Sequence, residues 1–163
     1  MNKACFIELN CIMDHQSNGE VAQEVVRGLL HLQDRGYFLM LVSEEPCPDK
    51  GVEVLSIVEG KYRILQKKLK ARGVRVRDWF YCMHTDDESC MCKFPSDYLM
   101  KRAAKEYGLS LEDCIMVGDI GVEILTGDVA GMQTVLCCPT KEYEGPKPEA
   151  EIENLAMMPL LVP

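Results

Sequence analysis

Short apolar runs alternate with amphipathic stretches along most of this chain. The apolar runs lie at residues 3–9, 37–43, 79–82, 114–118 and 133–138, and near-continuous runs of this kind are typical of strands covered on both faces. Between them, apolar residues recur at helical spacing and predict helices at 20–35, 59–72, 95–108 and from 119 to about 131. Residues 52–58 fit either a short strand or an irregular connector.

This alternation predicts the α/β class, with a single Rossmann-like doubly wound parallel sheet. The 163 residues are enough for one domain with a substantial core and too few for two comfortable ones. We therefore predict one α/β domain over 1–140 and a C-terminal tail over 141–163, packed on that domain or partly mobile. The prolines of the tail predict loose packing around one short apolar helix near 152–158, and 133–138 is the last predicted strand.

Polar residues stand directly after the predicted strands. Ligands of doubly wound sheets bind beyond the carboxyl ends of the strands, so these residues are expected to converge on one crevice. They are Glu8, Asn10, Ser43, Lys93, Asp119 and Glu123.

Four soft metal ligands lie within residues 82–92, which we call the metal loop. They form two pairs with i, i+2 spacing, Cys82 with His84 and Cys90 with Cys92, joined by a short acidic spacer. Side chains two apart in an extended chain point the same way, so each pair can offer two ligands to one point. Three thiolates and one imidazole are a ligand set that structural zinc prefers, and we predict a closed zinc site without a direct catalytic role.

The composition limits the binding partners and the cellular compartment that are expected for this chain. The net charge of −8 argues against nucleic-acid and anionic-membrane binding, and the basic helix predicted at 59–72 is interpreted as a solvated face. Nine cysteines, an odd total, and a start without a signal-like segment predict a reducing cytoplasm. The sequence also leaves open a function as a thiol-based metal sensor or carrier, which would use Cys47, Cys137 and Cys138.

The residues also carry a resemblance to a known family. The metal loop followed by Lys93-Phe94-Pro95, the segment Val117-Gly118-Asp119 and the helix behind it at 126–131 resemble the haloacid dehalogenase (HAD) superfamily of phosphatases. The closer resemblance is to its capless, zinc-containing branch, which includes histidinol-phosphate and heptose bisphosphate phosphatases. It implies a HAD-like core without a cap domain. It also implies magnesium at Glu8, Asp119 and Glu123, a nucleophile at Glu8, an acid–base residue at Asn10, and phosphate contacts from Ser43 and Lys93.

Several of these positions depart from the family pattern. Asn10 cannot shuttle a proton, Glu8 is a methylene longer than the family's aspartate, and Cys11 and Ile12 replace glycine and threonine. Glu44 and Glu45 follow Ser43, where they would repel a phosphate. These departures predict a phosphatase-like zinc protein that has lost its activity and acts by binding a protein partner or a small phosphorylated ligand. The alternative is a divergent Mg²⁺-dependent phosphomonoesterase acting on a small sugar or amino-alcohol phosphate, with Glu8 in the nucleophile position.

Overall fold

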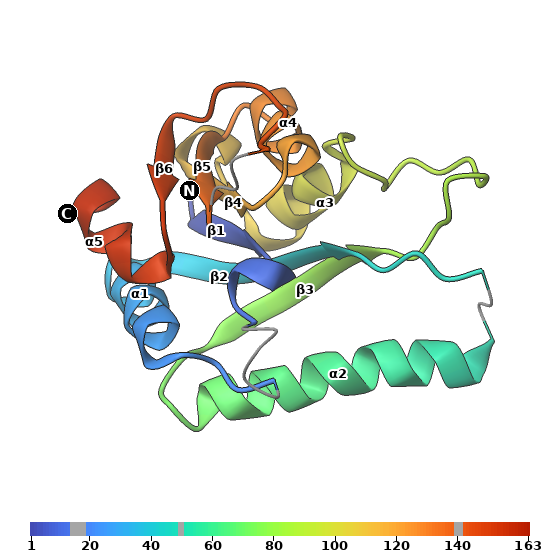
Figure 1. Ribbon diagram of the computed structural model, residues 1–163, viewed down its shortest axis with the longest axis horizontal. Helices are drawn as coiled ribbons and strands as arrows, with labels where there is room; N and C mark the ends of the chain where they lie inside the picture. The colour runs from blue at the N-terminus through green and yellow to red at the C-terminus, as the bar shows by residue number, and fades with distance from the viewer. Residues whose placement is uncertain (14–18, 49–50, 139–141) are drawn as a thin grey trace.

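Six parallel strands form one sheet in the computed structural model, which describes residues 1–13, 19–48, 51–138 and 142–163 (Figure 1). The strands are β1 (Lys3–Glu8), β2 (Tyr37–Glu44), β3 (Val76–Cys82), β4 (Ile115–Gly118), β5 (Gln133–Cys137) and β6 (Ala150–Ile152). Their order across the sheet is β3-β2-β1-β4-β5-β6, and each neighbouring pair is parallel. The predicted doubly wound parallel sheet is confirmed.

The chain reverses its direction of travel across the sheet between β1 and β4. It first adds strands on one side of β1 and then returns to place β4 on the other side, where Ile7 pairs with Val117. In sheets of this kind a crevice opens beyond the carboxyl ends of the two strands at the reversal. The residues that follow β1 and β4 therefore occupy the place where a ligand is expected.

Helices cover both faces of the sheet (Figure 1). One core layer packs α1 (Gln23–Asp34) and α2 (Val52–Lys70) on one face, and the other packs α3 (Tyr98–Tyr107) on the opposite face, the side that also carries α4 (Gly121–Val129). Alternate residues of a strand point to opposite faces, so Cys5 and Ile7 enter the first layer while Ala4 and Phe6 enter the second. The sequence therefore reads as continuous apolar runs because both faces are buried.

Helix α2 corrects the prediction for residues 52–72. Residues 52–58 are neither a strand nor a connector but the first part of one 19-residue helix, which begins after Gly51 and also contains most of the predicted basic helix. Val58, Leu65 and Leu69 are its buried residues, at a spacing that keeps them on one side. Packing of this stripe outweighs the weak helix propensity of the β-branched residues near the amino end.

The C-terminal tail contributes a strand to the sheet. Strand β6 pairs with β5, so 133–138 is not the last strand, contrary to the prediction. Beyond β6 the chain forms the 3-10 turn η3 (Leu155–Met157) and the short helix α5 (Met158–Leu161), and both lie against α1. Leu155 and Met158 are completely buried there. The described part of the tail is therefore packed on the domain through both hydrogen bonds and apolar contacts.

Two further 3-10 turns, η1 (Leu9–Cys11) and η2 (Leu111–Asp113), connect the elements. Among the described residues, no helix has the length and apolar character needed to cross a membrane.

Candidate functional site

Glu8 is the last residue of β1 and occupies the centre of the crevice. It is also the cap of η1, where its Oε2 accepts a hydrogen bond of 2.6 Å from the backbone N–H of Asn10. The side chain is only 5% exposed. The tight turn therefore folds back over the end of the strand and holds the carboxyl group in a defined orientation.

Asp119 faces the same point from the end of β4. An oxygen of Asp119, an oxygen of Glu8 and the sulfur of Cys11 all lie within 4.8 Å of one another. Asp119 Oδ1 is buried and has no hydrogen-bond partner among the described residues. A buried oxygen without a partner is costly, so this atom is well suited to a ligand that supplies positive charge or a donor.

Glu123 lies in the first turn of α4 and is buried. Its Oε2 accepts hydrogen bonds from the backbone N–H groups of Asp119, at 2.8 Å, and Ile120, at 3.3 Å. The three closely grouped donors of the crevice are Glu8, Asp119 and Cys11, and Glu123 lies outside that group. The structure thus places Glu123 behind Asp119, where it fixes the backbone that carries the Asp119 carboxyl group.

The crowding of these acids changes their protonation. Burial, the largest cause, and the negative charge of Asp119 together raise the pKa of Glu8 to about 7, against the hydrogen bond from Asn10. Burial likewise raises the pKa of Glu123 well above its usual range, with Glu8 the next contributor. A site that concentrates carboxylates in this way is stabilised by a bound cation.

The other predicted crevice residues make local contacts. Ser43 is buried, and its Oγ accepts a hydrogen bond of 2.9 Å from the indole N–H of Trp79. Asn10 is exposed and contributes its backbone N–H to Glu8. Lys93 forms an ion pair with Asp86 of the metal loop, and it therefore lies beside that loop in this structure.

Glu44, which was expected to repel a phosphate, has a hydrogen-bond partner of its own within the protein. Its Oε1 accepts a hydrogen bond of 2.7 Å from the backbone N–H of Phe94, directly after the metal loop. The same two segments are joined by a bond of 2.7 Å from Glu45 N to the carbonyl of Cys82. The side chain of Glu44 and the backbone of Glu45 thus connect the end of β2 to the metal loop.

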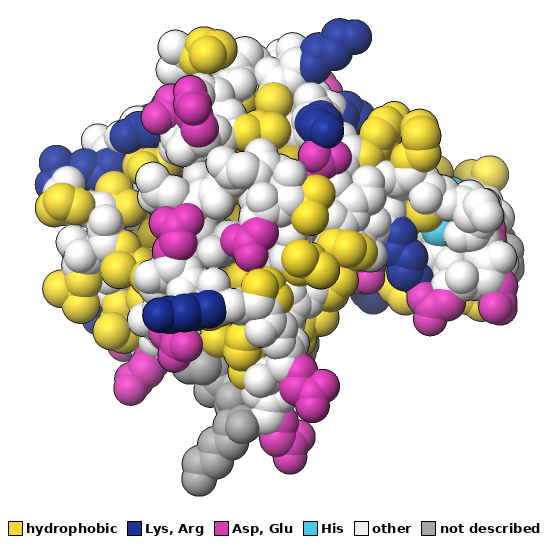
Figure 2. All heavy atoms as spheres, turned by 90° about the horizontal axis from the view of Figure 1, so that it is seen from above, with side chains coloured by type: hydrophobic (Ala, Val, Ile, Leu, Met, Phe, Trp, Pro, Cys, Tyr) yellow, Lys and Arg dark blue, Asp and Glu magenta, His cyan; other side chains and the backbone are white. Residues whose placement is uncertain are grey.

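The metal loop brings its four predicted ligands together. Cys92 Sγ lies 3.1 Å from Cys82 Sγ and 3.2 Å from His84 Nδ1, and Cys90 Sγ lies 3.8 Å from Cys82 Sγ. Bonds of about 2.3 Å to sulfur and 2.0 Å to nitrogen would place tetrahedral ligand atoms roughly 3.5–3.8 Å apart. These four residues could therefore hold a metal ion. The loop extends from the body on the right of Figure 1, and acidic side chains lie along one edge of the corresponding part in Figure 2.

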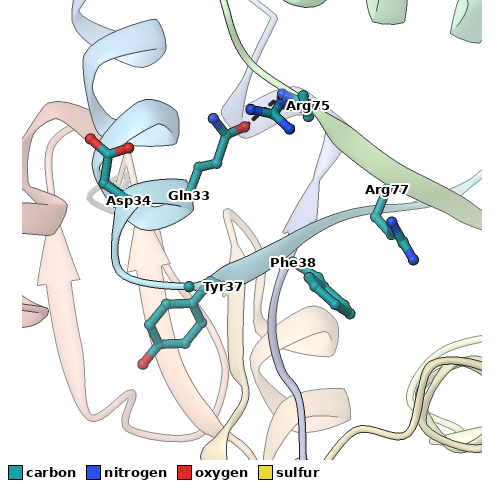
Figure 3. Close-up of a pocket in the computed structure, with 7 residues that line it drawn as sticks. Gln33, Asp34, Tyr37, Phe38, Arg75 and Arg77 are labelled. Carbon is teal, nitrogen blue, oxygen red and sulfur yellow. Dashed lines mark hydrogen bonds between the residues drawn. The ribbon is translucent and has the colours of Figure 1, made fainter.

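Among the pockets formed by the described residues, two are relevant to the location of the site. One, lined by Leu9, Met13, Glu45, Lys61, Tyr62, Leu65 and Trp79, adjoins the crevice because Leu9 follows Glu8. The other lies at the amino ends of β2 and β3, where Arg75 N donates to Gln33 Oε1 at 2.8 Å (Figure 3). Since ligands of such sheets bind at the carboxyl edge, the second pocket is remote from the candidate site.

Sequence comparisons connect this geometry to known phosphatases. A family model described as HAD-hydrolase-like matches residues 92–141. The chain is 27% identical to a D-glycero-beta-D-manno-heptose-1,7-bisphosphate 7-phosphatase of Helicobacter pylori, over 96% of this chain and 95% of that protein. It is also 27% identical to a D-glycero-alpha-D-manno-heptose-1,7-bisphosphate 7-phosphatase of Photorhabdus laumondii, over 69% of this chain and 66% of that one.

The fold comparison agrees. The structure of a D,D-heptose 1,7-bisphosphate phosphatase from B. bronchiseptica, complexed with magnesium and phosphate, superposes with a TM-score of 0.79. It is 16% identical and covers 99% of this chain and 98% of that one. The predicted resemblance to the HAD superfamily, and to its heptose bisphosphate phosphatase branch, is confirmed.

One prediction is wrong. The departures from the family pattern led us to expect a non-catalytic protein that acts by binding, but relatives that match 96% and 69% of the chain are named as phosphatases. The structure gives a physical reason for the error. Glu8 and Asp119 still meet at the crevice, and Glu44 is engaged by a backbone N–H instead of facing a ligand.

Proposed function

We propose that this HAD-like chain is a Mg²⁺-dependent phosphomonoesterase that acts on a small sugar or amino-alcohol phosphate, with Glu8 as the nucleophile. The observation that carries the proposal is the meeting of Glu8 with the unpartnered oxygen of Asp119 at the reversal of the sheet. The similarity to heptose bisphosphate phosphatases over 96% of the chain supports the reaction class and the sugar phosphate.

The crevice residues fit magnesium. Mg²⁺ binds oxygen ligands and usually retains several waters, so one or two carboxylates are sufficient. Asp119 Oδ1 is a buried oxygen in need of a cation, and Glu8 supplies a second carboxylate close by. The ion would neutralise the phosphate charge, and Glu123 would keep Asp119 in place through the backbone.

Glu8 performs the central step. One of its carboxylate oxygens attacks the phosphorus, a new P–O bond forms, and the bond between phosphorus and the alcohol oxygen of the substrate breaks. The departing alcohol takes a proton from water because Asn10 can donate a hydrogen bond but not an acidic proton. Water then attacks the phosphoryl-glutamate and releases phosphate, which restores the Glu8 carboxylate. The hydrogen bond from Asn10 N orients the carboxylate for both steps.

The pocket beside the crevice is the proposed binding site for the organic part of the substrate. It is lined mainly by apolar and aromatic side chains, with Lys61 as its cationic residue. Lys61 would contact a second anionic group, such as the remaining phosphate of a bisphosphate. The pocket is lined by Leu9, the residue directly after Glu8, and this position fits a small substrate.

We also propose that the metal loop holds structural zinc through Cys82, His84, Cys90 and Cys92. All four donors come from the protein, so no position remains for a catalytic water. The hydrogen bonds from Phe94 to Glu44 and from Glu45 to Cys82 connect this loop to the end of β2. A zinc-filled loop would thereby stiffen one wall of the crevice. Thiolate ligands also favour a reducing compartment such as the cytoplasm.

A phosphatase assay tests the proposal. The zinc-loaded protein with Mg²⁺ is expected to turn over at least one phosphomonoester in a panel of sugar and amino-alcohol phosphates at more than about 0.1 s⁻¹, against about 10 s⁻¹ for ordinary enzymes. Glu8→Ala should abolish turnover. Glu53→Gln, an exposed carboxyl on α2, is the matched control and should retain it.

Asn10→Asp gives a test in the opposite direction. It introduces an acid–base group at the family position, and such a group typically contributes about 10²–10⁴-fold in rate. The variant should therefore be faster than the wild type, and beryllofluoride should form an adduct on Glu8. Turnover that persists in Glu8→Ala, or no turnover anywhere in the panel, would show that the proposal is wrong.

A further inference from the structure

A cysteine lies in the crevice beside the two carboxylates. Cys11 ends the turn η1, is 5% exposed, and has its sulfur within 4.8 Å of oxygens of Glu8 and Asp119. This is the position at which the chain departs from the glycine of the family that it resembles. The substitution therefore adds a soft ligand to a pair of hard ones.

Further thiols surround this cysteine. Cys137, the last residue of β5, belongs to the same buried cluster as Cys11, and its Sγ lies 3.6 Å from Cys138 Sγ. Cys138 is exposed and adopts a left-handed backbone conformation with φ of 58°. One buried thiol and one exposed thiol thus follow each other at the end of the strand β5, in addition to Cys11. None of them belongs to the metal loop.

The combination of donors has a consequence for the ion. Carboxylates alone suit Mg²⁺, whereas thiolate ligands select softer ions, and affinity for a mixed nitrogen, oxygen and sulfur site rises toward Co²⁺ and Zn²⁺. The unpartnered Asp119 Oδ1 is the independent sign that this site is built for a cation. Cys11 is then the residue that determines which cation binds best.

We propose that the crevice is a mixed carboxylate–thiolate site that binds a borderline divalent cation, of the Zn²⁺ and Co²⁺ type, through Glu8, Asp119 and Cys11. This inference shares two carboxylates with the proposed magnesium site and so rests in part on the proposed function, but it does not depend on turnover. The two sites then hold different metals. The metal loop retains zinc, and the crevice exchanges Mg²⁺ for a softer ion when one is present.

Cobalt distinguishes the two sites. The protein is first loaded with one equivalent of Zn²⁺, which fills the thiolate-rich metal loop, and is then titrated with Co²⁺. Wild-type protein should develop a sulfur-to-cobalt charge-transfer band, because cobalt enters the crevice beside Cys11. The band should be lost in Cys11→Ser and Cys11→Ala and retained in Cys47→Ser, whose cysteine lies in neither ligand group.

Affinity provides the second measurement. In Cys11→Ser, Co²⁺ binding to the zinc-loaded protein should weaken by about tenfold or more because a soft ligand is lost, while Mg²⁺ binding should stay within about twofold. No charge-transfer band in the wild type, or equal Co²⁺ affinity in wild type and Cys11→Ser, would overturn the inference. The wild-type band can be measured even if a variant does not fold.

The outcomes also separate this inference from the proposed function. A band that depends on Cys11 in a protein without turnover would support the mixed site and contradict the phosphatase. Turnover with Mg²⁺ in a protein whose cobalt spectrum shows no sulfur ligand would do the reverse.

Discussion

The buried carboxyl of Glu8 makes the stability of this protein depend on pH. Its pKa is raised from 4.5 to about 7, chiefly by burial. The folded state therefore holds this proton more tightly than the unfolded chain does. The resulting stabilisation is complete below the unfolded pKa of 4.5 and is lost as the pH rises through about 7.

The size of the effect follows from the shift. One pKa unit corresponds to about 1.36 kcal/mol, so raising the pH from about 5 to about 8 should remove roughly 2–3 kcal/mol of unfolding free energy. For a chain of this size, that corresponds to a fall in Tm of roughly 4–12 °C. Glu123 acts in the same direction because burial raises its pKa as well.

Urea unfolding at several pH values measures this loss. The protein is kept zinc-loaded but free of Mg²⁺, and wild type is compared with Glu8→Gln, which removes the titrating group with little change in shape. The variant should show a flatter dependence between pH 5 and 8 than the wild type, and the slope that remains is expected from Glu123. Saturating Mg²⁺ should flatten the wild-type curve because the cation favours the ionised carboxyl.

The control is Glu53→Gln, which changes an exposed carboxyl on α2 and should retain the wild-type dependence. If Glu8→Gln loses as much stability between pH 5 and 8 as the wild type does, the assignment of the raised pKa to Glu8 is wrong.

Two further predictions concern the metal loop and the tail. Cys90→Ser should remove about one zinc ion per chain, that of the metal loop, and reduce the unfolding free energy by more than about 2 kcal/mol, because zinc binding is coupled to folding. Elemental analysis and thermal melts check this against Cys47→Ser, and unchanged zinc content and Tm would contradict it. Gly28→Ala would place its Cβ 2.0 Å from the Leu155 carbonyl oxygen, so separating α1 from the tail should cost about 1–3 kcal/mol. Gly60→Ala, which has nothing within 4 Å of the added Cβ, should instead stabilise α2 by about 0.5–1 kcal/mol; equal stability of the two variants would show that the tail does not pack as described.

The apolar pattern was enough to predict the sheet but not its full extent. Strands β1 and β2 are long, buried on both faces and bounded by turn residues, so their signal is strong. Strand β6 has only three residues at the sheet edge, one of them exposed, and its pairing with β5 is a tertiary effect. The start of α2 was missed for a related reason: its β-branched residues resemble a strand until the buried stripe further along the helix is considered.

The sequence indicated most of the crevice because the ends of parallel strands meet. Glu8 and Asp119 were expected together on that ground, and the structure brings them together. Cys11 was instead considered as a replacement for the glycine of the family pattern. The missing signal was the turn η1, because residues three apart in a 3-10 helix lie one above the other, which returns Cys11 toward Glu8. A turn prediction for residues 9–11 would have placed this thiol in the site.

The error about activity has a more general cause. Each departure from the family pattern was treated as a separate loss, as though the substituted side chain kept the position and duty of the original. The structure shows that such side chains can take on other contacts: Glu44 accepts from the metal loop, and Asn10 orients Glu8 through its backbone, which no side-chain substitution removes. The cost of a substitution depends on where its charge finally lies. Counting motif differences therefore overestimates the damage wherever the new group has a partner of its own, and the residue to test is the one that still faces the open oxygen of Asp119, which is Glu8.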